Sequence, residues 1–193
     1  NYIFNEVDSK LNIKSNFRDG NTVKKGDIIM NISGNTQSIL KAERLVLNCM
    51  QQMSAIATKT NNISKKISST NTKILDTRKT IPLNRKIQKW AVKIGGGKNH
   101  RFALDDMIMI KDNHIDYCGG ITQAIKKTKI YLKHNNLNLD IVVETRNIKE
   151  IKEVINEGGI KRILLDNFNF DDTRNAVKII DNKFETESSG GIT

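Results

Sequence analysis

The sequence predicts an α/β protein built from parallel βα units, and three observations support this prediction. From residue 72 onward, short apolar runs alternate with segments of helical spacing. The runs recur at intervals of roughly 20–35 residues, which is typical of parallel strands joined by helical crossovers. They are apolar almost throughout, as expected for strands that are buried on both faces. Either a barrel or a doubly wound open sheet is consistent with these features.

The expected elements follow one another along the chain. Residues 1–36 contain two β-like runs, at 2–7 and 27–34, and apolar spacing then indicates a helix over residues 38–60. Further strands are expected at residues 72–80, 106–114, 139–147, 161–168 and 184–193, and helices at residues 84–94, 121–134, 148–157 and 171–181.

Polar residues at the strand ends favour the barrel. In order along the chain they are Arg78 and Lys79, Lys111, Glu144, Asp166, and Ser189-Gly190-Gly191. In a βα barrel the functional groups of several strands meet at the carboxyl ends, whereas an open sheet concentrates its site at one switch point. Any one of these residues alone would usually mark only the place where a strand meets water. Together they combine cations, two carboxylates that suit Mg²⁺, and a glycine turn that suits a phosphate.

Composition and the motifs that are missing argue against several classes of function. The 193 residues are 37% hydrophobic, which is enough for a core, and the net charge of +11 permits nucleic acid, acidic membrane or phosphorylated small-molecule partners. The basic residues form no long run and do not alternate with aromatic ones, so we predict no nucleic-acid surface. No stretch has the length of a membrane span, and the sequence contains no HExxH, CxxC or GxSxG motif.

Two features bear on the setting of the protein. Cys49 and Cys118 are far apart, which is typical of free thiols in a reducing compartment, and we expect a cytoplasmic protein without a membrane partner. The chain begins at Asn1 and stops at "SGGIT", so we expect it to be cut at both ends.

The segment "GGGKNHR" (95–101) is not a P-loop, because it follows a helix and lacks the Gly-Lys-Ser/Thr ending. Gly95 is expected to cap the preceding helix. His100 and Arg101 then come just before a strand, where an arginine could bind a planar carboxylate through two hydrogen bonds.

Read together, six stretches resemble the quinolinate phosphoribosyltransferase family, also called nicotinate-nucleotide pyrophosphorylase (carboxylating). They are "AERLVLNCMQQMSAIAT", "LDTRKTIP", "KWAVKIGGGKNHR", "DMIMIKDNHI", "LLDNF" and "ETESSGGIT". The resemblance implies an open α/β sandwich domain followed by an incomplete α/β barrel. We expect residues 1–70 to be part of the sandwich with its dimer-contact helix, and residues 71–193 to be a barrel lacking its last strands. It also implies the family's reaction: quinolinate and phosphoribosyl pyrophosphate give nicotinic acid mononucleotide, pyrophosphate and CO₂, with Mg²⁺ as cofactor.

The resemblance also implies roles for individual residues. Quinolinate would be bound by Arg78, Lys79, His100, Arg101 and Lys111, and Arg44 would reach the site of the neighbouring subunit in a homodimer. Glu144 and Asp166 would lie near the ribose and contact the metal indirectly, through Mg²⁺-pyrophosphate. Lys79, Lys111, Glu144 and Asp166 form the expected catalytic set, and Ser189, Gly190 and Gly191 would hold the 5′-phosphate.

The sequence departs from the family pattern at three positions. Leu83 and Ala103 stand where the family usually has glycine, and Val142 replaces a carboxylate two residues before Glu144. The departures at Leu83 and Val142 leave open a catalytically inactive barrel. Two further alternatives remain: a related transferase with another acceptor, such as the molybdenum-transport-associated relatives, and a basic RNA-binding protein.

Overall fold

The structure, a computed structural model, describes residues 1–192. The chain divides into two compact units, each with most of its contacts within itself. The first unit comprises residues 1–102, and the second runs from Ala103 onward. Thr193, the last residue of the strand predicted at 184–193, lies outside the described residues.

The long helix α2 (Thr36–Lys66) is the main element of the first unit. It begins where the Asn35 side chain accepts a hydrogen bond from the Ser38 amide at 3.1 Å, a typical N-cap interaction. Ala42 and Val46, four residues apart, are buried on one face and pack in a small core with Phe4. The helix predicted at 38–60 is therefore confirmed, and it continues beyond the predicted end.

A two-stranded antiparallel sheet, β1 (Asn12–Ser15) with β2 (Met30–Ser33), packs against this core. The β-like run predicted at residues 2–7 is wrong, because these residues form helix α1 (Tyr2–Val7). Ile3 and Val7 are spaced by one helical turn and pack toward the same core, a pattern that six residues cannot distinguish from a short strand. Helix α3 (Arg85–Ile94) lies against α2 and completes the unit.

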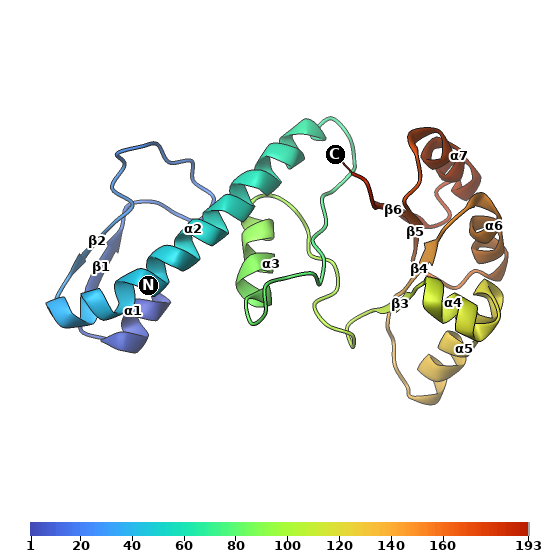
Figure 1. The fold of residues 1–193 in the computed structure, drawn as a ribbon, viewed down its shortest axis with the longest axis horizontal. Helices are drawn as coiled ribbons and strands as arrows, with labels where there is room; N and C mark the ends of the chain where they lie inside the picture. Colours follow the sequence, from blue (N-terminus) through green and yellow to red (C-terminus); the bar gives the residue numbers. More distant parts are fainter. Residues whose placement is uncertain (193) are drawn as a thin grey trace. The chain divides into compact units, whose positions relative to one another are not determined.

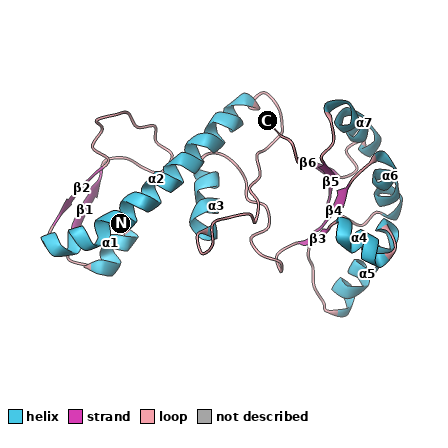
Figure 2. Cartoon of the chain, viewed as in Figure 1, coloured by secondary structure: helices cyan, strands magenta, loops and turns pink. Residues whose placement is uncertain are grey.

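The second unit is a four-stranded parallel sheet with helices gathered on one face (Figures 1 and 2). Its elements are β3 (Ile108–Ile110), α4 (Asp112–Cys118), α5 (Ile121–His134), β4 (Ile141–Thr145), α6 (Ile148–Glu157), β5 (Arg162–Asp166), α7 (Phe170–Ile180) and β6 (Glu185–Ser189). The strands are ordered β3-β4-β5-β6, so each new strand is added beside the previous one, as in a barrel wall. The predicted α/β class is confirmed, and the structure has a small antiparallel sheet and a larger parallel one. The parallel sheet is consistent with the expected incomplete barrel.

Alternation along the strands separates the two faces of the parallel sheet. Ile163 and Leu165 on β5 pack under the helices in a core that includes Ile151 of α6. Leu164 and Asp166 alternate with them and therefore point to the opposite face. The predicted site residues at the strand ends therefore lie on strands that pack against the helices on their other face.

Two predicted strands are much shorter than expected. Residues 72–80 form only an isolated parallel bridge between Leu75 and Lys98. The strand predicted at 106–114 ends at Ile110, because the chain turns into helix α4 at Asp112. After Leu75, the Asp76 side chain bonds to Lys89 of α3, and after Ile110 the chain enters α4 at Asp112. Neither segment therefore extends the sheet further.

Replacing Ile151 by alanine should destabilise the protein by about 2–5 kcal/mol, because the side chain is fully buried and its loss leaves a cavity. Urea unfolding followed by circular dichroism measures this change. Ile130→Ala on the exposed face of α5 is the matched control, since Ile130 is 67% exposed. Equal destabilisation by the two variants would contradict the assignment of the core.

Candidate active site

Lys111 and Glu144 meet at the carboxyl end of the parallel sheet. Lys111 follows β3, Glu144 lies on β4, and the Lys111 Nζ donates to Glu144 Oε2 at 3.0 Å. The carboxylate is 11% exposed and the lysine 44% exposed, so the pair opens to solvent from the lysine side. The structure therefore brings these two predicted residues together, as a cation and a carboxylate on adjacent strands.

Asp166 and the glycine turn meet at the neighbouring strand ends. Asp166 on β5 pairs in register with Ser189 on β6. Between them lies Asn167, whose amide N–H donates to the Ser189 carbonyl at 2.8 Å and whose side-chain Nδ2 donates to Asp166 Oδ2 at 2.8 Å. Asn167 belongs to the "LLDNF" stretch, but the sequence indicates no role for it, because only the folded register reveals this contact.

Gly190 has to be glycine at this turn. Its φ of +83° is in the left-handed region, and a Cβ there would come within 2.6 Å of Asn167 Cγ. Gly191 also has a positive φ, of +62°. Two successive glycines of this kind leave backbone N–H groups free of side-chain cover, which is typical of a phosphate-binding turn.

The carboxylates suit an indirectly held metal better than a metal cage. Among residues 1–192 there is no group of three His, Cys, Asp or Glu side chains that could hold an ion. Glu144 is already bonded to Lys111, and Asp166 to the Asn167 amide. Two such carboxylates at one edge fit a Mg²⁺ that keeps waters and phosphate oxygens as its other ligands.

A further cation at this edge, Arg146, is engaged in holding the helices. It donates to Glu150 at the start of α6 and to Asp116 on α4. The hydrogen bonds to Glu150, and then to Asp116, raise the pKa of Arg146 above its usual value. We therefore assign Arg146 a structural role.

In the first unit, the predicted cations lie on two segments that are bonded to each other. Asp76 N donates to the Lys98 carbonyl at 3.2 Å, and Lys98 N donates to Ile74 O at 2.8 Å, which joins the strand-like segment before Arg78 to the segment before His100. The Arg78 Nε is buried and has no hydrogen-bond partner among the described residues. A buried guanidinium nitrogen of this kind needs an acceptor, and a bound carboxylate would supply one.

The glycine run before His100 allows α3 to approach α2 closely. Gly95 ends α3, as predicted, but in a right-handed conformation with φ of −73°. A Cβ on Gly95 would lie 2.7 Å from the Thr60 Cβ of α2. The first glycine therefore serves helix packing, while Gly96, with φ of +90°, turns the chain toward His100 and Arg101.

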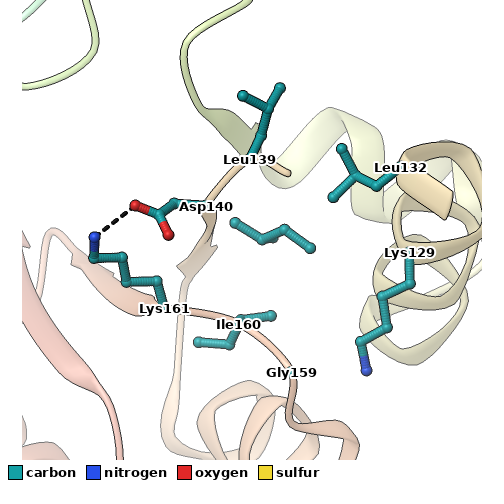
Figure 3. Close-up of a pocket in the computed structure, with 8 residues that line it drawn as sticks. Lys129, Leu132, Leu139, Asp140, Gly159, Ile160 and Lys161 are labelled. Carbon is teal, nitrogen blue, oxygen red and sulfur yellow. Dashed lines mark hydrogen bonds and ion pairs between the residues drawn. The ribbon is translucent and has the colours of Figure 1, made fainter. Parts of the chain in front are cut away.

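The remaining predicted residues are more exposed. Lys79 lies exposed in the segment that follows Asp76, and Arg44 is exposed on α2. A pocket of the second unit lies elsewhere: Asp140, Gly159, Ile160 and Lys161 line it at the amino ends of β4 and β5 (Figure 3). That position is opposite the strand ends that carry Glu144 and Asp166, and in barrels the amino end contributes to stability.

Two family domains together match nearly the whole chain. Residues 1–54 match the quinolinate phosphoribosyl transferase N-terminal domain, and residues 56–193 match the C-terminal domain. The chain belongs to the quinolinate phosphoribosyl transferase family. The resemblance inferred from its motifs is thereby confirmed, whereas the domain boundary expected at residues 70/71 stays a prediction.

Named relatives agree with this membership. The chain is 46% identical to a chloroplastic nicotinate-nucleotide pyrophosphorylase (carboxylating) of Arabidopsis thaliana over 99% of its own length and 58% of the relative. It is 40% identical to a probable nicotinate-nucleotide pyrophosphorylase of Bacillus subtilis, over 98% of its length and 64% of that protein. The chain thus spans about 58–64% of the length of these relatives.

Solved structures of the family share the fold. The nicotinate-nucleotide pyrophosphorylase from Francisella tularensis has a TM-score of 0.91 and 41% identity, covering 98% of this chain and 66% of the other. NadC from Streptococcus pyogenes has a TM-score of 0.91 and 34% identity, with the same coverage. In the described residues of the present chain, no helix is long and apolar enough to cross a membrane.

Proposed function

We propose that this protein is a quinolinate phosphoribosyltransferase (decarboxylating). It transfers the phosphoribosyl group of phosphoribosyl pyrophosphate to the ring nitrogen of quinolinate, and nicotinic acid mononucleotide, pyrophosphate and CO₂ are released. The proposal rests chiefly on the match of both family domains to a chain that carries the expected cations and carboxylates. The names of the relatives from Arabidopsis thaliana and Bacillus subtilis support it.

Quinolinate recognition is assigned to the cations. Quinolinate carries two neighbouring carboxylates, and Arg78, His100 and Arg101 provide donors suited to planar anions. The buried and unpartnered Arg78 Nε is the observation that most favours an anionic ligand in the first unit. Lys79 would add positive charge in the first unit, and for Lys111 of the second unit the family resemblance implies a contact with quinolinate. The net charge of +11 would concentrate both anionic substrates.

The strand ends of the second unit are assigned to phosphoribosyl pyrophosphate. Ser189, Gly190 and Gly191 would bind the 5′-phosphate through backbone N–H groups. Glu144 and Asp166 would lie near the ribose and contact Mg²⁺-pyrophosphate indirectly, through water or phosphate oxygens. When bound, Mg²⁺ neutralises the charge that develops on the departing pyrophosphate.

The chemistry needs no covalent nucleophile from the protein. As the bond from C1 of the ribose to pyrophosphate breaks, positive charge develops at C1, and a carboxylate such as Glu144 or Asp166 stabilises it. The ring nitrogen of quinolinate donates its electron pair to C1 and becomes cationic. The bond to the adjacent carboxylate then breaks, its electron pair returns to the ring, and a proton takes the place of CO₂. The protein's part is to orient the two substrates and to stabilise charge.

The homodimer belongs to the same proposal. Arg44 is exposed on α2, and it would complete the quinolinate site of a neighbouring subunit. Arg44→Ala should then raise the quinolinate KM by about 10-fold without changing the thermal unfolding temperature, since the side chain lies on the surface. Steady-state kinetics measures the effect, and an unchanged KM would remove Arg44 from the site.

Calorimetric titration of quinolinate tests the proposed ligand. We expect micromolar binding of quinolinate and at least about 10-fold weaker binding of nicotinate, which lacks one carboxylate and so loses roughly one charge-assisted contact. Equal binding of the two compounds would point to another acceptor. Absence of quinolinate binding in a folded sample would favour the inactive barrel.

A further inference from the structure

Asp76 lies two residues before Arg78 and accepts three hydrogen bonds in a nearly buried position. Its Oδ1 accepts from the His100 amide N–H at 2.8 Å and from the Lys89 ammonium, and its Oδ2 accepts from the Asn99 side chain. The side chain is only 8% exposed. A single carboxylate therefore joins the segment that carries Arg78 to the segment that carries His100.

Lys89 of α3 reinforces the same junction. Its side chain is 4% exposed, and besides the ion pair with Asp76 its Nζ donates to the His100 carbonyl at 3.0 Å. The Asn99 side chain in turn donates to the Lys89 carbonyl at 2.9 Å. Both the amide and the carbonyl of His100 are thus held by one buried ion pair, so the position of this residue is set from both sides.

The contribution of the Asp76–Lys89 pair to stability does not by itself explain why it is buried. Lysine is seldom buried, and a buried ion pair often stabilises a fold no better than well-packed apolar side chains would. The pair does fix the positions of two segments, since its bonds join the segment that carries Arg78 to the segment that carries His100 and Arg101. Its position therefore indicates that it orients the predicted quinolinate-binding side chains.

Arg85, one helical turn before Lys89 on α3, joins the same two segments further along. Its Nη1 donates to the Phe102 carbonyl at 3.1 Å, its Nη2 to the Arg78 carbonyl at 3.4 Å, and its Nε to Thr80 Oγ1 at 3.3 Å. The guanidinium carbon also lies 5.9 Å from the centroid of the Phe102 ring. Helix α3 therefore fastens both segments at two successive turns.

We propose that the buried Asp76–Lys89 ion pair is a positioning element for quinolinate recognition, which sets the place of Arg78 relative to His100 and Arg101. The inference rests on the proposed function and adds two residues that bind no substrate themselves. A dicarboxylate of fixed shape is bound tightly only if the groups that bind it are held in place beforehand. Loss of the pair should therefore weaken quinolinate recognition specifically.

The test compares Lys89→Met and Asp76→Asn with the wild-type protein in steady-state kinetics and in quinolinate titration. We expect the quinolinate KM and Kd to rise by about 10-fold or more, while the KM for phosphoribosyl pyrophosphate stays within about twofold, because its proposed ligands lie in the second unit. Lys129→Met is the matched control. It removes a lysine whose side chain is 35% exposed and whose Nζ lies 3.1 Å from Glu157, at the pocket of Figure 3. This variant should leave both KM values unchanged.

The double variant Asp76→Asn/Lys89→Met separates geometry from stability. It leaves no unpaired buried charge, so the unfolding temperature should recover toward that of the wild type, while the quinolinate KM should stay high. If Lys89→Met does not fold, Asn99→Ala removes one donor to Asp76 without breaking the ion pair. A smaller rise of the quinolinate KM, by about threefold or more, is then expected.

Several outcomes would overturn the inference. It is wrong if folded single variants bind quinolinate like the wild type, or if both KM values rise together and recover with stability in the double variant. If the wild-type protein itself does not bind quinolinate, the proposed function fails and this inference fails with it. Normal wild-type binding together with unaffected variants would overturn only the role of the ion pair.

Discussion

Replacement of Arg78 by alanine is expected to lower kcat/KM for quinolinate by about 10²-fold or more and to raise the quinolinate KM. The loss corresponds to one charge-assisted contact of roughly 3 kcal/mol. The buried Arg78 Nε, which has no hydrogen-bond partner among the described residues, is the reason to expect so large an effect. Steady-state kinetics with quinolinate as the varied substrate measures it.

The control is the same substitution at an exposed arginine outside the proposed site. Arg174 on α7 is 75% exposed, and the ion pair found for it is with Asp171, one turn earlier. Arg174→Ala should leave kcat/KM within about twofold, as is usual for surface substitutions. If Arg78→Ala behaves like this control, Arg78 is not part of the site.

Gly190→Ala is expected to raise the KM for phosphoribosyl pyrophosphate by about 10-fold or more. Alanine at φ of +83° is strained, and its Cβ would overlap the Asn167 side chain and come within 3.2 Å of the Asn167 backbone nitrogen. Because Asn167 also donates to Asp166, the strain would displace the turn and the carboxylate together. Varying the concentration of phosphoribosyl pyrophosphate at saturating quinolinate gives the KM.

Gly119→Ala separates backbone strain from this displacement. Gly119, at the end of α4, has the same φ of +83°, but a Cβ there would have no atom within 4 Å. It should cost about 1–2 kcal/mol of stability and leave the KM for phosphoribosyl pyrophosphate unchanged. An equal rise of KM in both glycine variants would indicate a general loss of stability in place of a local effect on the turn.

Much of the fold could be predicted from the sequence because the parallel sheet is encoded in apolar runs. Strands β4 and β5 are buried almost throughout, and such runs between helices are hard to mistake. Short elements were less predictable. Helix α1 has only six residues, and α4 begins at Asp112, directly after an apolar run. In such short segments the apolar pattern does not distinguish a helix from a strand, so contacts with the rest of the fold determine which one forms.

The candidate site was predictable to a similar degree. The residues at the carboxyl ends of β3 to β6 were identified from their position after apolar runs, and the pairing of Lys111 with Glu144 follows from adjacent parallel strands. Asp76 and Asn167 were visible as residues of the motifs, but no sequence pattern indicates that a carboxylate is buried or that a side chain reaches the next turn. Those features depend on contacts between residues far apart in the chain.

Several expectations stay predictions. They are the cytoplasmic location, the homodimer with Arg44 at its site, the Mg²⁺ cofactor and the absence of nucleic-acid binding, which rest on composition or on the family resemblance alone. Leu83 lies at φ of +64°, which agrees with the glycine usual there in the family.

The most direct test of the central claim is product analysis after incubation with quinolinate, phosphoribosyl pyrophosphate and Mg²⁺. Quinolinate labelled with ¹³C in its 2-carboxylate should give nicotinic acid mononucleotide, with one labelled CO₂ and one pyrophosphate released for each nucleotide formed. Omitting either substrate should abolish all three products. A folded protein that binds quinolinate but forms no nucleotide, or that forms a nucleotide without releasing labelled CO₂, would contradict the account.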